Sequence, residues 1–180
     1  MKQISITRVS HTIHTHKGFD EKGCYGCPCK DACCRYGCDV DRESYDLIIE
    51  NQAWIEEKIG KNISECFEKN RSGDSAYLGG NSLRSRVGPS GYCIFHVRKG
   101  IGCVLYGLFQ EKKVNKRIIP SICRLFPLTW EDGVLCVYDE LPGHVIPKTC
   151  NVKDPKNMTK KTLAETLKDE IDDILSIKKV

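Results

Sequence analysis

Half of the chain's cysteines lie in one stretch of fifteen residues. The sequence from residue 24 to residue 38 reads CYGCPCKDACCRYGC and contains six of the twelve cysteines. Covalent crosslinks, a metal site and a redox centre would each use thiols in this density. A chain of 180 residues is long enough to bury a hydrophobic core, so it does not need crosslinks merely to fold. The rest of the sequence has to decide among the three uses.

Composition and the N-terminal residues favour metal binding over disulfides. The hydrophobic fraction of 40% and the charged fraction of 29% are typical of a soluble globular protein. The net charge of +4 is mild and the basic residues are spread along the chain, so nucleic-acid binding is not indicated. The start, MKQISITRVS, lacks an apolar run of signal-peptide length, and no stretch approaches the length of a membrane span. We therefore expect a cytoplasmic protein with no membrane partner, whose thiols are kept reduced.

The spacing within the dense stretch suits metal ligands. Thiolates bind zinc and iron well, and the two-residue separation of Cys24 and Cys27 lets one tight turn aim both sulfurs inward. Adjacent residues rarely bind the same ion without backbone strain, and a disulfide between neighbours is also strained. Cys33 and Cys34 therefore indicate two metal sites, a multinuclear cluster, or one ligand beside one packing thiol.

Later cysteines divide into two kinds. Cys93 and Cys103 flank a glycine-containing turn, and prolines stiffen the backbone before Cys123 and Cys150, which suits preorganised ligands. In contrast, Cys66 in a helical pattern and Cys136 in the alternating stretch VLCVY are typical of packing thiols, since free cysteine behaves as a small hydrophobic residue.

The order of the segments CYGCPCKDACC, GYCIFHVRKGIGCVLYG, IPSICRLFP and IPKTC resembles the CxxCxxCC cysteine-cluster family, also called YkgJ-type. That family is described as a zinc- or iron-chelating domain. The resemblance covers about residues 24–150, and it is closest at Pro120–Pro127, with Glu43 at the acidic helix start. One departure is that Lys30 stands where the family has its second cysteine, and Cys29 substitutes one position earlier.

The resemblance implies eight thiolate ligands, enough for two four-coordinate sites, and leaves Cys24 and Cys38 outside the pattern. The implied set is Cys27, Cys29, Cys33, Cys34, Cys93, Cys103, Cys123 and Cys150.

Other side chains could contribute to such a site. His14 and His16 would share one face of a leading strand and His11 the other, as exposed histidines or as imidazole ligands. His96 would lie beside the site as a hydrogen-bond donor. Arg124 directly follows a predicted ligand, so it would offset thiolate charge, hold an anionic partner, or be exposed.

We expect one α+β domain over residues 1–180, with a cysteine-cluster core over 24–150 and a C-terminal helix over 158–178. Alternation predicts a strand from Ile4, and Asp41 and Gly60 bound a predicted helix. We also expect a short helix over 63–69, a loop over 71–91, a charged helix or loop over 108–119, and two hairpins. The first hairpin turns at Lys99–Gly100 and the second at Asp132–Gly133.

The sequence thus predicts a metal-binding protein that holds zinc or an iron–sulfur cluster, with a structural, partner-binding or redox role. One alternative is an enzyme, because the resembled family includes flagellin lysine N-methylases; no S-adenosylmethionine-binding motif is recognisable here. The other is a metal sensor or delivery protein with a labile site. Whether the protein is an enzyme stays open at this point.

Overall fold

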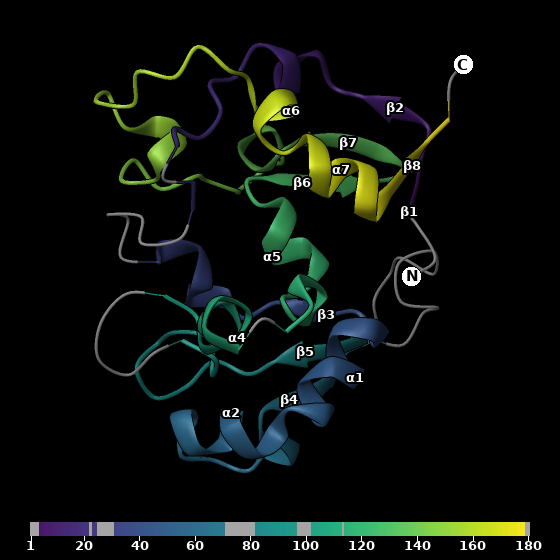
Figure 1. Cartoon of the computed structure of the whole chain (residues 1–180). Helices are drawn as coiled ribbons and strands as arrows, with labels where there is room; N and C mark the ends of the chain where they lie inside the picture. The colour runs from purple at the N-terminus through teal and green to yellow at the C-terminus, as the bar shows by residue number, and fades with distance from the viewer. Residues whose placement is uncertain are drawn as a thin grey trace. The chain divides into compact units, whose positions relative to one another are not determined.

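The computed structural model describes residues 4–21, 23–24, 31–70, 82–96, 102–112 and 114–178. Contacts divide the chain into two compact units. Unit 1 comprises Met1–Lys30 and Arg124–Val180, and unit 2 comprises Asp31–Cys123. Each unit combines helices with short strands (Figure 1), which confirms the predicted α+β class.

The sheet of unit 2 has three antiparallel strands in the order β3 (Asp39–Val40), β5 (Ser82–Ser85) and β4 (Phe67–Asn70). The predicted helix over 63–69 is wrong. Only a short 3-10 turn, η3 (Ile63–Glu65), precedes β4, whose residues pair with β5 from Phe67 opposite Ser85 onward. The predicted loop over 71–91 is wrong at residues 82–85, which form β5, and is confirmed at 86–91; residues 71–81 lie outside the described part. A strand partner distant in sequence decided both outcomes.

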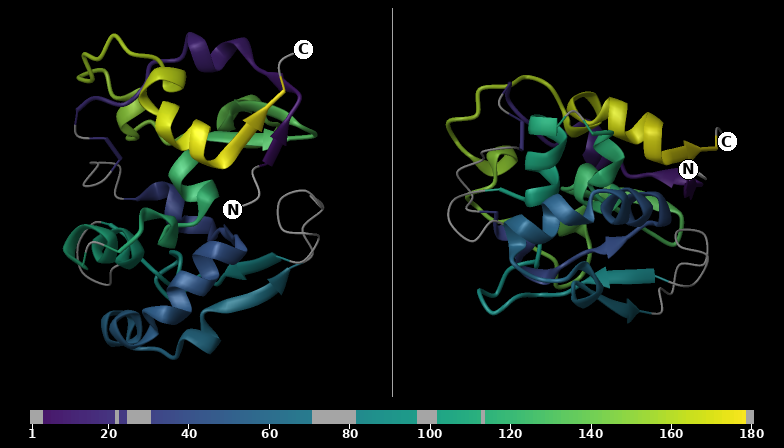
Figure 2. Two further views of the ribbon diagram at one scale, coloured as in Figure 1. Left: turned by 45° about the vertical axis from the view of Figure 1, so that its right-hand side comes forward. Right: turned by 60° about the horizontal axis from the view of Figure 1, so that its bottom comes forward.

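The predicted helix between Asp41 and Gly60 is confirmed, with one interruption. Helix α1 (Arg42–Glu50) begins where Asp41 accepts a hydrogen bond from the Ser44 N–H at 3.0 Å, and α2 (Gln52–Ile59) ends at left-handed Gly60. The two helices run in different directions (Figures 1 and 2). Ile48 and Ile55 are fully buried and share one core with Phe95, Leu105 and Leu108. This core belongs to unit 2 alone.

The first predicted hairpin is wrong in the described residues, since neither of its two runs forms a strand there. Single bridges pair Val87 with Cys93 and His96 with Cys103, and then helix α4 (Val104–Lys112) begins. Val104, Leu105 and Leu108 are buried at helical spacing, because a short apolar run fits a helix as well as a strand. The predicted turn at Lys99–Gly100 lies outside the described residues. After α4 follow η4 (Lys116–Ile118) and α5 (Ser121–Leu125), so the region 108–119 is part helix and part loop.

Unit 1 contains two small sheets. Strand β1 (Ile4–Ile6) pairs in parallel with β8 (Leu175–Ile177), as Figure 2 (left) shows. The other sheet has the order β2 (Arg8–Val9), β7 (Val134–Val137) and β6 (Leu128–Glu131). Asp132 and Gly133 have φ values of 49° and 73°, as a two-residue hairpin turn requires, so the second predicted hairpin is confirmed.

The C-terminal region is helical over less of its length than predicted. Thr162 and Glu165 form a capping box for α6 (Leu163–Thr166), and α7 (Lys168–Ile174) follows. Five apolar residues at helical spacing in this region are buried: Leu163, Leu167, Ile171, Ile174 and Leu175. The helix ends at Ile174 because Leu175–Ile177 pair with β1 instead.

Several 3-10 turns complete the structure. They are η1 (His11–His14), η2 (Ala32–Tyr36), η5 (Tyr138–Glu140) and η6 (Asn151–Lys153). His11 and His14 therefore belong to a turn capped by Ser10, so the predicted strand face of His14 and His16 is wrong. Among the described helices, none has both the length and the apolar character to cross a bilayer.

Candidate functional site

Six cysteines of unit 2 come from separate segments of the chain. Cys33 and Cys34 lie in η2, Cys38 precedes β3, Cys123 lies in α5, and Cys93 and Cys103 lie in the segments around the two single bridges. Every described cysteine carries a free thiol. Within this part of the chain, disulfides are not the use of the sulfur.

Three of these thiols form a hydrogen-bonded relay centred on Cys38. Its hydrogen bond to Cys123 holds the pKa of the Cys38 thiol well above the usual range, and its bond with Cys93 raises the pKa of Cys93. The same bond to Cys38 acts to lower the pKa of Cys123, although burial and the neighbouring thiols leave that pKa above its ordinary value. Cys123 therefore accepts at the end of the relay. The Cys123 residue as a whole is nevertheless exposed, whereas Cys93 is buried; the burial that raises the pKa of Cys123 is that of its sulfur.

The adjacent thiols of Cys33 and Cys34 hydrogen-bond to each other, which lowers the pKa of Cys33 and raises that of Cys34. Cys34 also lies within electrostatic reach of Cys103 and Cys123. Burial, followed by the charge of a Cys93 thiolate, raises the pKa of Cys103 to about 12. All six thiols are thus coupled to one another in a single network.

Ser85, buried in β5, joins two of the thiols. Its hydroxyl accepts the Cys38 N–H at 2.8 Å and lies 3.4 Å from the Cys38 sulfur and 3.3 Å from the Cys93 sulfur. The Cys38 carbonyl in turn accepts the Ser85 N–H at 2.8 Å. Gly37 permits this approach, because it has a φ of 65° and a Cβ there would lie 2.3 Å from the Ser85 carbonyl oxygen.

Further hydrogen bonds join the other segments. The Asp31 carbonyl accepts the Cys34 N–H at 2.8 Å, and the Cys34 carbonyl accepts the Cys93 N–H at 2.6 Å. His96, predicted beside the site, places Nε2 3.0 Å from the Asp31 carboxylate and stacks on Tyr92 at 4.4 Å between centroids. Asp31 itself has a φ of 51°, which is uncommon for a residue with a side chain.

Five of the eight predicted ligands therefore lie in one network: Cys33, Cys34, Cys93, Cys103 and Cys123. Cys27 and Cys29 lie outside the described residues. Cys150 is buried in unit 1 at the start of η6, and its role as a ligand stays a prediction. Cys38 lay outside the predicted ligand set, because the resembled pattern has no place for it; as an extra cysteine of the dense stretch it was, with Cys24, a candidate only for the labile ligand of a sensor or delivery protein.

The described side chains alone do not form a metal cage. Within the described ranges, no group of three or more His, Cys, Asp or Glu side chains is placed to hold a metal ion. The thiols meet instead as hydrogen-bonded pairs. Cys27 and Cys29 lie outside the described ranges, so this statement does not cover them.

Cys66 and Cys136 are buried, as predicted for packing thiols. Burial raises the pKa of each to about 11. The Cys66 thiol donates to the Asn62 carbonyl at 3.3 Å within its own turn. These two residues show how a cysteine of this protein behaves when packing is its only role.

Arg124 is buried, so the prediction of an exposed side chain is wrong. Its Nη1 pairs with Glu170 at 2.7 Å and with Asp173 at 2.8 Å, both on α7 of unit 1. These two carboxylates already compensate the guanidinium charge.

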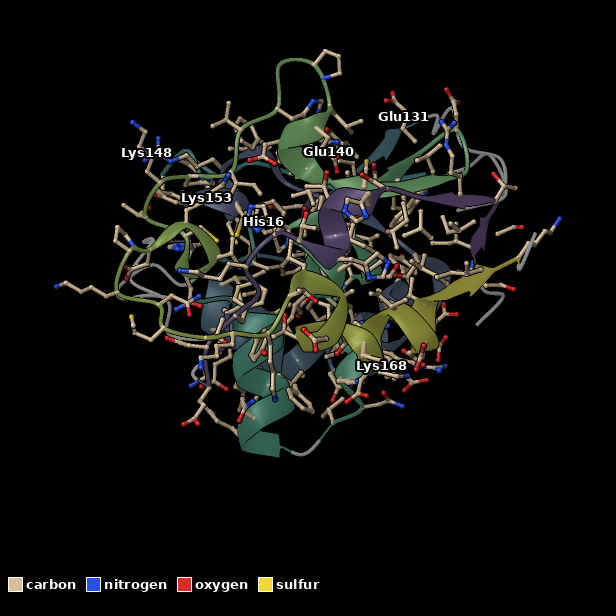
Figure 3. The ribbon with its side chains drawn as sticks, turned by 90° about the horizontal axis from the view of Figure 1, so that it is seen from above. His16, Glu131, Glu140, Lys148, Lys153 and Lys168 are labelled. Carbon is tan, nitrogen blue, oxygen red and sulfur yellow. The ribbon has the colours of Figure 1, made fainter. Side chains whose placement is uncertain are left out.

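Unit 1 has a shallow cavity of about 500 Å³ between β2, the hairpin and η5, lined among others by Glu131, Cys136 and Glu140. Figure 3 labels both glutamates. Burial alone would raise the pKa of Glu140, but hydrogen bonds from Ser10, the Val137 N–H and Thr12 outweigh it and lower that pKa. The carboxylate is thus occupied in holding the turn together, and the cavity offers no reactive pair.

No family model matches this chain, and no curated protein or solved structure matches it either. The resemblance to the cysteine-cluster family therefore depends on the quoted motifs alone.

Proposed function

We propose that this protein binds zinc or an iron–sulfur cluster through the thiolates of unit 2. We also propose that Cys38 is one of the ligands. One observation carries the proposal: six thiols from five segments interact in one network, whereas the Cys66 thiol donates to a carbonyl of its own turn and Cys136 is buried beside two glutamates. Packing alone gives no reason to gather sulfur in this way, because any small apolar side chain would fill the same space.

The pairwise contacts are compatible with metal coordination. In a tetrahedral zinc site with Zn–S bonds of about 2.3 Å, neighbouring sulfurs are about 3.8 Å apart. Thiols in hydrogen-bonding contact are at a similar separation, so an ion can replace the shared protons without large rearrangement of a pair. The described residues do not supply a third or fourth ligand around one centre by themselves.

The chemistry of each metal form follows from the donors. With zinc, four thiolates would close a site and make the ion structural. With iron, hydrogen bonds to the sulfurs would help to set the reduction potential, and the Ser85 hydroxyl is placed to donate one to Cys38 or Cys93.

A second candidate function is metal sensing or delivery. The exposure of Cys123 favours it, because a ligand that solvent and other thiols can reach is exchanged more readily than a buried one. If Cys123 is a ligand, a change that buries its side chain should lower the rate at which zinc moves from the full-length chain to a competing chelator. If Cys123 does not bind zinc, that rate should stay unchanged.

The decisive experiment is metal analysis of the full chain purified without exposure to air. Zinc without visible absorbance, or iron with acid-labile sulfide and a brown colour, would each support the proposal and distinguish the two forms. Cys38→Ser and Cys33→Ser should each lower the metal content per chain. Cys136→Ser is the matched control and should leave it unchanged.

Two outcomes would overturn the proposal. One is metal-free protein that also fails to take up zinc or ferrous iron with sulfide at stoichiometric concentrations. The other is a native Cys38–Cys93 or Cys38–Cys123 disulfide in that same preparation, which would make the network a dithiol site.

A further inference from the structure

Two buried carboxylates, Asp31 and Asp41, lie at the ends of the cysteine-bearing segments of unit 2. Each accepts a hydrogen bond from at least one distant segment that carries a thiol of the network within three residues: Gly102 and His96 donate to Asp31, and Ser121 donates to Asp41. Asp31 is 9% exposed and Asp41 5% exposed, so water competes little for these bonds.

The Asp31 carboxylate joins three segments. Its Oδ2 accepts the Gly102 N–H at 2.5 Å and lies 3.0 Å from His96 Nε2. Gly102 precedes Cys103, His96 belongs to the segment of Cys93, and Asp31 itself leads into Cys33 and Cys34. The left-handed backbone of Asp31 is a strain that persists only where surrounding contacts fix it.

The Asp41 carboxylate joins two helices. Its Oδ1 accepts the Ser44 N–H at 3.0 Å, which begins α1. Its Oδ2 accepts the Ser121 N–H at 2.9 Å and the Ser121 hydroxyl at 2.7 Å, at the start of α5. Cys38 precedes Asp41 by three residues and Cys123 follows Ser121 by two, so this carboxylate holds together the two ends of the Cys38–Cys123 contact.

We infer that Asp31 and Asp41 are positioning residues that divide the thiols into two sets. Asp31 places Cys33, Cys34 and Cys103, Asp41 places Cys38 and Cys123, and Cys93 belongs to both through its bonds to Cys34 and Cys38. The inference deepens the proposed function and rests on it for its purpose, because ligands held in place before binding lower the cost of ordering them around an ion.

Substitution by asparagine should have different effects at the two positions. At Asp31 both hydrogen bonds end on one oxygen, so the amide oxygen of Asp31→Asn can replace it, and asparagine tolerates the left-handed backbone. At Asp41 each oxygen accepts a backbone N–H, so Asp41→Asn must turn its own NH₂ toward one of them. A merely structural role would predict the same asymmetry in overall stability, but not a response confined to particular thiols.

The test is time-resolved alkylation of the metal-free full chain with iodoacetamide, read thiol by thiol by mass spectrometry. Asp41→Asn should speed the alkylation of Cys38 and Cys123 about tenfold, as expected for the loss of a buried hydrogen bond, and leave Cys33, Cys34 and Cys103 unchanged. Asp31→Gly keeps the positive φ without strain. It should speed the alkylation of Cys33, Cys34 and Cys103 and leave that of Cys38 and Cys123 unchanged. Asp31→Asn should behave as the wild type.

Controls are present in the same chain. Cys66 and Cys136 report global opening, and Asp46→Asn removes a half-exposed carboxylate of α1 that pairs with Arg42. Equal effects of Asp31→Asn and Asp31→Gly, no effect of Asp41→Asn, or a uniform rise that includes Cys66 and Cys136 would each overturn the inference. Zinc content is measured separately, so a chain that shows the expected alkylation pattern but binds no metal would refute the proposed function and leave the two positioning roles standing.

Discussion

Cys136 of unit 1 and Cys38 of unit 2 have different surroundings. In unit 1, Cys136 lies alone on β7, where burial raises its pKa to about 11. In unit 2, Cys38 contacts two other thiols and a buried hydroxyl. Cys66 shows that the unit itself is not the cause, since it lies in unit 2 and behaves like Cys136. Burial makes a thiol of this protein inert, and contact between thiols makes it a candidate ligand.

The hydrophobic cores do not differ in the same way. Unit 1 buries residues such as Ile6, Leu135 and Leu163 completely, and unit 2 does the same with Ile48 and Ile55. Each unit therefore has apolar burial to stabilise it. Among the residues that the structure describes, only those of unit 2 form a polar, sulfur-rich centre, so the two units should respond differently to metal removal, mutation and pH.

Chelation should have the largest effect and should separate the units. If thiolates of unit 2 hold zinc, its removal costs that unit binding free energy of about 10 kcal/mol. Hydrogen exchange followed by mass spectrometry should then show faster exchange across residues 31–123 and little change across 124–178. Equal acceleration in both units would contradict the assignment of the metal to unit 2.

Truncation of the unit 1 core should have the next largest effect and leave the metal in place. Leu163 is fully buried, so Leu163→Ala should lower the free energy of unfolding by about 2–5 kcal/mol in denaturant titrations. Metal content per folded chain should not change, because the ligands proposed in unit 2 do not depend on that side chain. A proportional loss of metal would break the comparison.

Alkaline pH should destabilise unit 1 through Cys136. Above pH 9.0 the unfolded thiol ionises, whereas the buried thiol keeps its proton until about pH 11. The unfolded state then binds fewer protons, so the free energy of unfolding falls with pH in this window, by less than about 2 kcal/mol because water screens part of the effect. Cys136→Ala should show a shallower decline from pH 9 to 11, and parallel curves would contradict the role of this thiol.

Two glycines should give small effects of opposite sign. Gly133→Ala in the unit 1 hairpin should destabilise by about 1 kcal/mol, because its φ is 73° and the new Cβ would lie 3.0 Å from Thr7 Oγ1. Gly107→Ala in α4 of unit 2 meets nothing within 4 Å and should stabilise by up to about 1 kcal/mol. Thermal unfolding of the two variants beside the wild type measures both, and shifts in the same direction would count against this account.

Local signals determined much of the fold. Asp41 and Gly60 bound their helices, Thr162 and Glu165 form a capping box, and Asp132–Gly133 turns a hairpin, because each depends on hydrogen bonds and backbone angles within a few residues. The density of cysteine likewise pointed to a thiol centre, and Cys66 and Cys136 were recognisable as packing residues from the apolar pattern around them.

Only the tertiary structure decided the rest. Phe67–Asn70 became a strand because β5 lies beside it, and Val104 began a helix because its apolar run could be buried at helical spacing. Cys38 joined the thiols because Ser85, Cys93 and Cys123 meet it from distant parts of the chain. Contacts between residues far apart in sequence leave no fixed spacing in the sequence. The sequence therefore predicted that cysteines form the site, but it did not predict which cysteines belong to it.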